Sequence, residues 1–206
     1  MGSGDVYKRQ YLYCSYLVGA DGGNSRVRKL LDPAYYEQSK EVLIYQAYYT
    51  FSDMGSLEDA HWYVFFNPQI GDIISAIHHK DEFLTLCVGG FKGRKLKESM
   101  ETFKNLLAEN FQVKIIEKKR EEGCLLRLPP PFLGKGRIIL SGEAAGLVYL
   151  NGEGISAAID SGYRAGKSIA EGIKSGAEIL EIYQKKAAGI LNHIKLCSEK
   201  VHFFTH

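Results

Sequence analysis

Two glycine-rich loops, each directly after a short apolar run, constrain the fold of this chain more than any other feature. The first is Gly-Ala-Asp-Gly-Gly at 19–23, and the second is Gly-Glu-Ala-Ala-Gly at 142–146. An apolar run that ends in such a loop is typical of a buried strand in an α/β sheet, and ligands bind where such strands end. Both loops are therefore expected at the ligand-binding edge of a sheet.

The interval between the loops has a different pattern, which is typical of an antiparallel sheet. Short polar links separate four apolar runs, at 42–51, 61–66, 72–79 and 83–90. Consecutive strands with short links predict a meander. The segment 95–111 has apolar residues at helical spacing and a charged opposite face, which predicts an amphipathic helix that covers the sheet. One more strand is expected at 113–121.

The residues around the first loop predict a strand and a short helix. The apolar, aromatic-rich run at 11–19 indicates a buried strand. A helix is expected at 25–31, with Asn24 or Ser25 as its cap. Asp32, which a proline follows, should end that helix.

The residues around the second loop predict a connector, a strand and two helices. Three consecutive prolines make 125–132 a stiff extended connector. A short buried strand is expected at 136–141, directly before the loop. A long helix should follow at 155–174, and a last helix should run from 177 into the 190s.

Composition and charge exclude several classes of protein. A net charge of +2 with 45% hydrophobic residues is typical of a soluble globular chain and argues against nucleic acid as the main partner. No apolar run reaches the roughly 18–20 residues of a membrane span. The four cysteines are scattered without a C-x-x-C pair, which favours free thiols in a reducing compartment. His78 and His79 are neighbours in a predicted strand and should point to opposite faces, so no metal site is expected.

Each loop also has a purely structural interpretation. The first could be a turn in which glycine supplies positive φ and Ser25 is a plain helix cap. In the second, Asn151 could cap the following helix, and Glu153 could lie favourably in its first turn. Neither loop alone decides between a structural and a ligand-binding role.

Together the two loops resemble the flavoprotein family with the para-hydroxybenzoate hydroxylase type of fold. The segment 19–28 is similar to the family motif G-A-D-G-x-x-S-x-V-R. The segments 142–146 and 152–155 resemble its later G-D-A-A-G loop and the G-E-G-hydrophobic start of a helix. The spelling Gly-Glu-Gly-Ile-x-x-Ala-x-x-Ser-Gly at 152–162 is most similar to the geranylgeranyl reductase branch.

The resemblance implies an α/β (α+β) fold: a partial FAD-binding Rossmann-like domain with an inserted, mainly antiparallel β-sheet substrate domain. It places parts of the FAD-binding domain at 11–40 and 124–175, and the substrate domain with its covering helix at 41–123. A C-terminal helical segment occupies 176–206. Residues 1–10 are polar and glycine-rich and fit none of these parts, and we interpret them as a remnant of cloning or sequence assembly.

The resemblance also implies roles for residues of the second loop and the helix after it. Residue 143 would accept a hydrogen bond from a ribityl hydroxyl of FAD, a role that suits a carboxylate. This chain has Glu143 where the family has aspartate, so the longer side chain must fold back or the loop must move. The backbone N–H groups of Gly154 and Ile155, at a helix N-terminus, would stabilise negative charge on reduced flavin. The remaining implied cofactor contacts of this region are Gly142, Ala144, Gly146 and Gly152.

Two residues of the first loop complete the implied cofactor site. Asp21 and Arg28 are similar to the family residues that brace the flavin and shape the loop beside it. Arg28 would equally suit a charge on the surface of a helix, and the sequence leaves both interpretations open.

The chain departs from the family in two places. The family opens with a strand, a G-x-G-x-x-G loop and a helix that cradle the pyrophosphate, and no such motif is present. We therefore expect that an N-terminal portion is missing and that this chain binds FAD weakly or not at all. The aromatic Y-x-W-x-F-P run of the reductase branch is also absent at 73–78, which leaves prenyl-lipid specificity open. Aromatic residues that could line a substrate cavity or form a sheet core are Tyr48, Tyr49, Trp62, Tyr63, Phe65 and Phe66.

The function that the resemblance implies is that of an FAD-dependent oxidoreductase. It would reduce double bonds of an isoprenoid or other apolar substrate, with NAD(P)H or another reductant as electron donor. The alternatives are a flavin-dependent monooxygenase and a catalytically inert fragment of either enzyme. No catalytic acid or base can be named. The expected partner is a small apolar substrate such as a prenyl lipid, and the expected location is the cytoplasm, with peripheral membrane contact.

Overall fold

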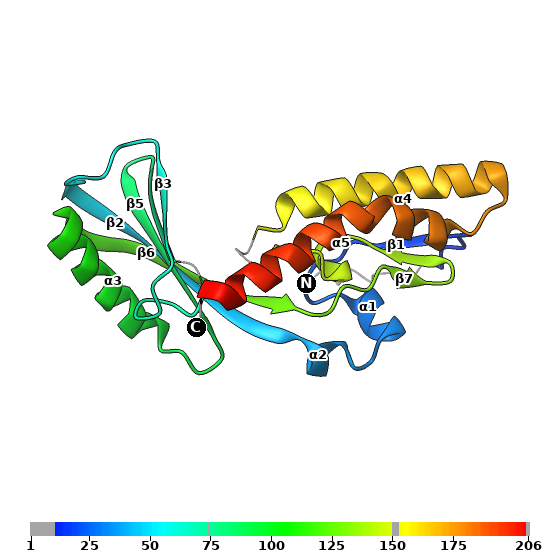
Figure 1. The fold of residues 1–206 in the computed structure, drawn as a ribbon, viewed down its shortest axis with the longest axis horizontal. Coiled ribbons are helices and arrows are strands. Elements are labelled where there is room, and N and C mark those ends of the chain that lie inside the picture. Colours follow the sequence, from blue (N-terminus) through cyan, green and yellow to red (C-terminus); the bar gives the residue numbers. More distant parts are fainter. Residues whose placement is uncertain (1–10, 74, 150–152, 205–206) are drawn as a thin grey trace, which may run out of the picture.

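The chain forms two lobes, each built around its own sheet. The structure, a computed structural model, describes residues 11–73, 75–149 and 153–204, with side chains up to 196. We call residues 40–128, which carry a five-stranded sheet, the large-sheet lobe, and the described residues on either side of them the small-sheet lobe. Figure 1 shows that two long strands of the large sheet connect the lobes. This mixed α/β architecture confirms the predicted fold class.

In the small-sheet lobe, two strands that are far apart in the sequence pair in parallel. β1 (Leu17–Gly19) lies beside β8 (Ile138–Leu140), and β7 (Gly134–Lys135) adds an antiparallel edge. The register places Gly19 opposite Leu140, so the C-terminal ends of β1 and β8 coincide. The two glycine-rich loops therefore begin side by side, as the sequence predicts.

β1 is much shorter than the buried strand expected at 11–19. Its partner β8 offers only three residues, and β1 has no second neighbour among the described strands. As a result, Leu17 and Val18 are 42% and 38% exposed. The expectation of a buried strand is wrong here because no described strand pairs with the free edge of β1.

The helices of this lobe agree with the sequence more closely. α1 (Arg26–Leu31) begins after Ser25, whose hydroxyl accepts a hydrogen bond from the Arg28 backbone N–H at 2.9 Å, so Ser25 rather than Asn24 is the cap. It ends at Asp32, as predicted, and the one-turn helix α2 (Tyr35–Gln38) follows.

Two long helices stabilise the small sheet from the C-terminal part of the chain. α4 (Ile155–Ser175) and α5 (Ile179–Phe204) pack against each other and share a core with β8. The buried Tyr183 hydroxyl of α5 donates a hydrogen bond to the Leu140 carbonyl at 3.0 Å, at the end of β8. α5 is thereby fixed to the strand end from which the second loop begins.

The strand order of the large sheet differs from a simple meander. β3 (Trp62–Phe65), β4 (Ser75–Lys80) and β5 (Phe83–Phe91) do follow one another, but β2 (Lys40–Asp53) lies between β5 and β6 (Lys114–Leu128). The predicted meander of four strands is therefore wrong for its first strand, which pairs with β5 rather than with β3. The chain returns from β5 through a helix across one face of the sheet, so β6 arrives beside β2 rather than beside β5.

β6 is longer than the strand expected at 113–121. It pairs with β2 as far as Leu128, which lies opposite Lys40. The prediction of an extended connector at 125–132 is thus wrong for its first half, because four of its residues belong to the sheet. Only the three prolines and Phe132 remain outside, since proline cannot donate a ladder hydrogen bond.

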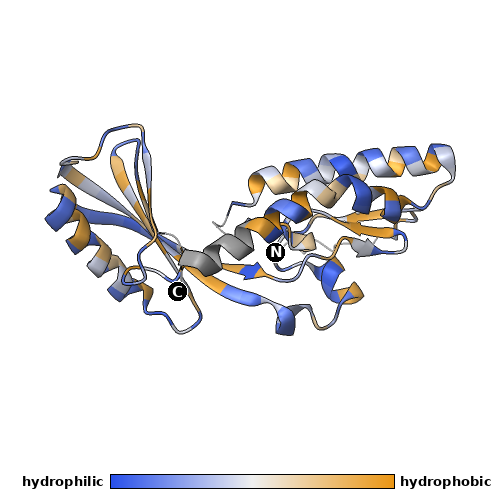
Figure 2. Cartoon of the chain, in the orientation of Figure 1, coloured by the Kyte–Doolittle hydropathy of each residue, from blue (hydrophilic) through white to orange (hydrophobic). Residues whose placement is uncertain are grey.

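The helix between β5 and β6, α3 (Leu96–Phe111), covers one face of the large sheet as predicted. Met100, Phe103 and Leu107 are at most 1% exposed and pack in one cluster with residues of β2, β4 and β5. Figure 2 shows hydrophobic and hydrophilic residues alternating along α3, as expected for a helix with one buried face. We call the other side of the sheet the open face.

Strand alternation divides the predicted aromatic set between the two faces. Tyr49, Tyr63 and Phe65 belong to the core cluster beneath α3, so for them the core interpretation holds. Trp62 pairs with His78 on the open face and is 61% exposed. Tyr48, 7% exposed, lies in the same cross-strand row. Of the predicted set, Trp62 and Phe66, which is 60% exposed directly after β3, are the members with a large exposed surface.

Candidate functional site

The two glycine-rich loops are in direct contact. The Ser141 backbone N–H donates a hydrogen bond to the Gly19 carbonyl at 3.0 Å. The half-buried Glu143 side chain lies against the backbone of Gly23, where an added Cβ would overlap its Oε1 and lie 2.7 Å from its Cδ. The Glu143 side chain thus lies against the first loop, and its contact with a flavin stays a prediction.

The carboxylate of Asp21 is bound to the start of α1. It accepts hydrogen bonds from Ser25 Oγ at 2.5 Å, from Arg26 N at 2.7 Å and from Val27 N at 3.2 Å. Burial raises the pKa of Asp21, but the hydrogen bonds from Ser25 and from the two N–H groups outweigh it and lower the pKa below its ordinary value. Asp21 therefore shapes the first loop, and its contact with a flavin stays a prediction.

Arg28 is buried between the two loops, so it is not a surface helix charge. Its side chain is 1% exposed, and its guanidinium carbon lies 4.7 Å from the Tyr35 ring centroid. It donates hydrogen bonds to the carbonyls of Pro130 at 2.7 Å and Ala144 at 3.4 Å. Burial lowers the pKa of Arg28, against the opposing charge of Asp32. Arg28 thus ties α1 to the second loop and to the proline segment before it.

The second loop is a 3₁₀ turn, η1 (Gly142–Ala145), held by its own glycines. Gly142 and Gly146 have φ values of +59° and +75°, which glycine adopts without strain. The Gly142 N–H donates to Ser161 Oγ of α4 at 2.9 Å, so this donor is already occupied. Ala144 is fully buried. Gly142, Ala144 and Gly146 thus have structural roles in the second loop. Contact between these residues and FAD stays a prediction.

The start of α4 carries the remaining predicted residues. Gly152 and Asn151 lie outside the described residues. The Glu153 carboxylate accepts hydrogen bonds from Ser156 Oγ at 2.6 Å and from Ser156 N at 2.8 Å, and the Ser156 hydroxyl and N–H lower its pKa. The Ile155 N–H also contributes to that lowering, while Gly154 is the residue before the helix. Glu153 precedes the N-cap Gly154, so the prediction that it lies in the first turn is wrong, although its carboxylate accepts the Ser156 N–H of that turn. Donation from Gly154 and Ile155 to a flavin stays a prediction.

The site contains residues that sequence reasoning missed. Tyr35 is fully buried, and its hydroxyl donates to the Gly23 carbonyl. Arg127 of β6 donates to Asn24 of the first loop and to Glu41 at 3.2 Å, which links the lobes. Cys124 of β6 lies near enough for Glu143 to raise its pKa, after the larger effect of burial. No local pattern identifies them, because each acts through a partner distant in sequence.

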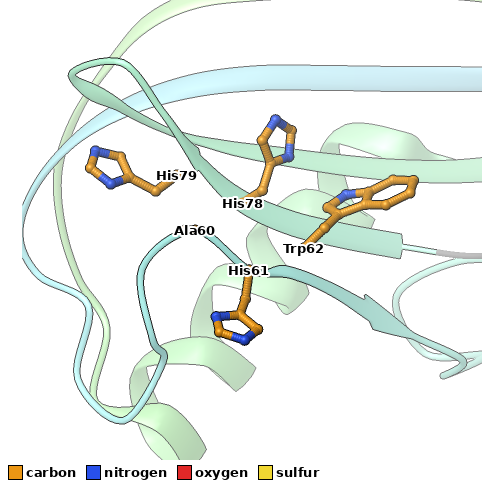
Figure 3. A pocket seen from close by; sticks show the side chains of 5 residues that line it. All are labelled: Ala60, His61, Trp62, His78 and His79. Carbon is orange, nitrogen blue, oxygen red and sulfur yellow. The ribbon is translucent and has the colours of Figure 1, made fainter.

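A pocket of about 270 Å³ lies elsewhere, at the start of β3. Its lining residues are Ala60, His61, Trp62, His78 and His79, and Figure 3 shows His78 and His79 pointing in different directions. His79 Nδ1 lies 2.7 Å from Asp59 Oδ1. No group of histidine, cysteine, aspartate or glutamate side chains in the described part of the chain could hold a metal ion.

These observations define a class of protein before any comparison. Paired parallel strands end in two glycine-rich loops, a carboxylate lies where the loops meet, and an antiparallel sheet is inserted between them, which is the arrangement of a dinucleotide-binding flavoprotein. The chain belongs to the family described as FAD binding domain, which it matches over residues 4–194.

Known proteins of similar sequence and structure agree with this assignment. Protein CbrA of Escherichia coli O9:H4 (strain HS) is 31% identical over 157 residues, which cover 74% of this chain and 41% of CbrA. A geranylgeranyl bacteriochlorophyll reductase-like protein from Thermoplasma acidophilum matches with a TM-score of 0.67 at 16% identity, over 93% of this chain and 52% of the other. The structure of pqsL, a probable FAD-dependent monooxygenase from Pseudomonas aeruginosa, matches with a TM-score of 0.59 at 14% identity, over 91% of this chain and 54% of pqsL. The chain therefore spans about two fifths of its curated relative.

FAD is the cofactor of this family, and the site fits it at Glu143. No residue of the described ranges donates a hydrogen bond to that carboxylate. The Glu143 side chain is half-buried and extends from the second loop to the backbone of Gly23 in the first. Such a group suits a hydroxyl donor on a ligand. Separately, none of the described helices is both long and apolar enough to cross a membrane.

Proposed function

We propose that this chain is the later part of an FAD-dependent oxidoreductase in which Glu143 accepts a hydrogen bond from a ribityl hydroxyl of FAD. The observation that carries the proposal is the Glu143 carboxylate itself, which lies at the contact of the two loops without a donor from the described residues. When bound, FAD supplies the hydride chemistry. Asp21 and Arg28 hold the loops around it, and the N–H groups of Gly154 and Ile155 approach the ring.

The test of this assignment is the FAD affinity of the longer protein. Loss of a charged acceptor from a buried hydrogen bond costs about 1.5–3 kcal/mol, so Glu143→Ala should raise the FAD dissociation constant at least about tenfold. Glu122→Ala, on the open face of the large sheet, is the control and should leave it unchanged. Full FAD affinity in Glu143→Ala would show that the ribityl assignment is wrong.

For the reaction, we propose reduction of double bonds in an isoprenoid or other apolar substrate. The open face of the large sheet supports an apolar ligand, since Trp62 and Val64 are 61% and 38% exposed there. The likeness to a geranylgeranyl bacteriochlorophyll reductase-like structure supports the same choice, by fold alone. A membrane-bound substrate would also bring the protein to a membrane surface.

A flavin-dependent monooxygenase is the second candidate, and one feature of the open face favours it. The Tyr48 hydroxyl donates to Glu122 Oε1 at 2.6 Å, and Gln46 Nε2 donates to the same carboxylate at 2.9 Å. This polar network suits a substrate that bears a hydroxyl or amine better than a bare hydrocarbon. Turnover without oxygen would exclude the monooxygenase, and strict dependence on oxygen would exclude the reductase.

We also propose that a strand–loop–helix segment of the longer protein covers the free surfaces of the small-sheet lobe. α4 exposes Ile155, Ile159 and Tyr163 by 76%, 70% and 65%, on the side away from its buried residues. On the same side, a Cβ at Gly162 or Gly166 would meet nothing within 4 Å. A helix that is apolar on two sides is expected to be buried on both, and the free edge of β1 suits an added strand.

Two results would test this segment. The upstream coding sequence should encode a strand, G-x-G-x-x-G and a helix, and its absence there would refute the proposal. The 206-residue chain alone should purify without a flavin spectrum, because the pyrophosphate lacks its loop. Tight, stoichiometric FAD on this chain would contradict that expectation.

A further inference from the structure

Tyr35 is buried beneath the first glycine-rich loop and holds it by one hydrogen bond. Its side chain is 0% exposed, and its hydroxyl donates to the carbonyl of Gly23. The guanidinium of Arg28 lies over the ring, 4.7 Å from its centroid. The hydroxyl is therefore fixed in place from two sides, by packing and by its acceptor. Burial raises the pKa of Tyr35, so it stays a neutral donor over the working pH range.

The other side of the same glycine receives Glu143. A Cβ at Gly23 would overlap Glu143 Oε1 and lie 2.7 Å from Cδ, and a Cβ at Gly22 would lie 4.0 Å from Oε2. The carboxylate thus occupies the volume that a side chain at residue 23 would fill. Gly23 does not have a positive φ, unlike Gly22 at +76°, so a side chain at residue 23 would displace the Glu143 carboxylate without straining the backbone.

We propose that Tyr35 and Gly23 form a seat that positions the Glu143 carboxylate for the flavin, and that this seat is matched to glutamate. The inference rests on the proposed role of Glu143. Tyr35 is a positioning residue, because it acts on the flavin only through Gly23 and Glu143. Aspartate is one methylene shorter, so its carboxylate would not reach the seat, and the requirement for glycine at residue 23 would disappear.

A double-mutant cycle in FAD affinity tests the match between Gly23 and Glu143. In the longer FAD-binding protein, Gly23→Ala should raise the FAD dissociation constant about tenfold, which is the loss of one charge-assisted hydrogen bond. In a Glu143→Asp background, the same Gly23→Ala change should alter it less than about twofold. Equal effects of Gly23→Ala in the two backgrounds would overturn the proposal.

The hydroxyl of Tyr35 is tested by removing it alone. Tyr35→Phe should weaken FAD binding and change the visible circular dichroism of the bound flavin, because the carboxylate at the ribityl chain shifts. Tyr36→Phe is the matched control, since the neighbouring ring packs against Arg127 and Lys29 through its face. If Tyr35→Phe leaves both the affinity and the dichroism as in Tyr36→Phe, Tyr35 is not a positioning residue.

A measurement without flavin separates the seat from the proposed function. In urea unfolding of the 206-residue chain, Gly23→Ala should lower the midpoint slightly with Glu143 present, because only the end of a flexible side chain has to move, and not at all with Glu143→Asp. Coupling here together with unchanged FAD affinity in Glu143→Ala would support the seat's geometry but refute its role for flavin. Absence of coupling, with FAD affinity still dependent on Glu143, would refute the seat while the proposed function stands.

Discussion

Arg28 shows how much of this site depends on one buried charge. In place of water, two backbone carbonyls and two aromatic rings surround its guanidinium. The guanidinium also forms an ion pair with Asp32 at 3.6 Å. A cation without water is tolerated only where such partners surround it. Because these partners come from the end of α1, α2, the proline segment and the second loop, the residue joins distant parts of the chain into one site.

Removing that charge should therefore destabilise the protein. We expect Arg28→Met to lower the free energy of unfolding by about 2–4 kcal/mol, because buried carbonyls lose their donor. Equilibrium urea denaturation measures this. Arg26→Met, at an exposed position of the same helix, should change it by less than about 0.5 kcal/mol. If Arg28→Met lowers the free energy of unfolding by less than about 1 kcal/mol, Arg28 does not hold these parts of the chain together.

Asp21 gives a prediction in pH. Its pKa in the folded protein lies below the ordinary 3.8, so its stabilising effect is complete above that value and disappears as pH falls through the folded-state pKa. Asp21→Asn should therefore lower stability at neutral pH and flatten the loss of stability below about pH 4. Thermal unfolding across this range tests it, with Asp81→Asn at the β4–β5 turn as control. Parallel pH curves for wild type and Asp21→Asn would contradict the prediction.

At the scale of elements, one side-chain hydrogen bond joins α4 to the second loop among the described residues, in addition to packing contacts. Ser161, fully buried, accepts the Gly142 N–H at 2.9 Å. Ser168, two turns further along the same helix, is equally buried but donates only to the Arg164 carbonyl of its own helix at 2.7 Å. The two serines have the same chemistry and burial, and differ in whether a partner outside the helix depends on them.

This pair offers a matched comparison. Ser161→Ala should cost about 1–3 kcal/mol in unfolding free energy, because it leaves a buried backbone N–H unsatisfied. Ser168→Ala should cost less than about 1 kcal/mol, because the Arg164 carbonyl can keep its helical bond. Calorimetric melting temperatures provide the comparison. If the two variants melt alike, Ser161 does not hold the loop.

The elements also show where prediction from sequence ends. Helix caps such as Ser25 and the buried face of α3 were predictable, because they depend on neighbours three or four residues away. The strand order was not, because the place of β2 beside β6 is decided by pairs as distant as Lys40 and Leu128. The loops and Glu143 were predictable from their motif, while Tyr35 and Arg127 were not, since each meets its partner only in the folded chain.

At the scale of the whole molecule, the distribution of apolar surface is uneven. The large-sheet lobe packs Tyr49, Phe65 and Phe103 in the core beneath α3, and its exposed aromatic residues are Trp62, Phe66 and Phe91. The small-sheet lobe leaves an apolar stripe on α4, at Ile155, Ile159 and Tyr163, and a free strand edge at β1. Exposed apolar surface of this kind marks a contact with another element or another molecule.

The isolated chain should therefore associate with itself or bind hydrophobic dyes through α4. We expect Ile159→Lys to reduce the binding of an apolar dye and the apparent mass in light scattering. Leu30→Lys, at an isolated position that is 84% exposed, should have little effect. Unchanged dye binding in Ile159→Lys would show that the stripe on α4 is not a contact surface.

The parallel pair β1 and β8 has a consequence for the order in which the protein folds. The large-sheet lobe is one continuous stretch of chain, so all its strands are available before synthesis reaches β8. The small sheet must instead join segments that leave the ribosome far apart in time, and Arg28 meets Ala144 across 116 residues. Contacts so distant in sequence form slowly. The FAD site is therefore expected to be the last part of the molecule to assemble, on a large-sheet lobe that is already folded.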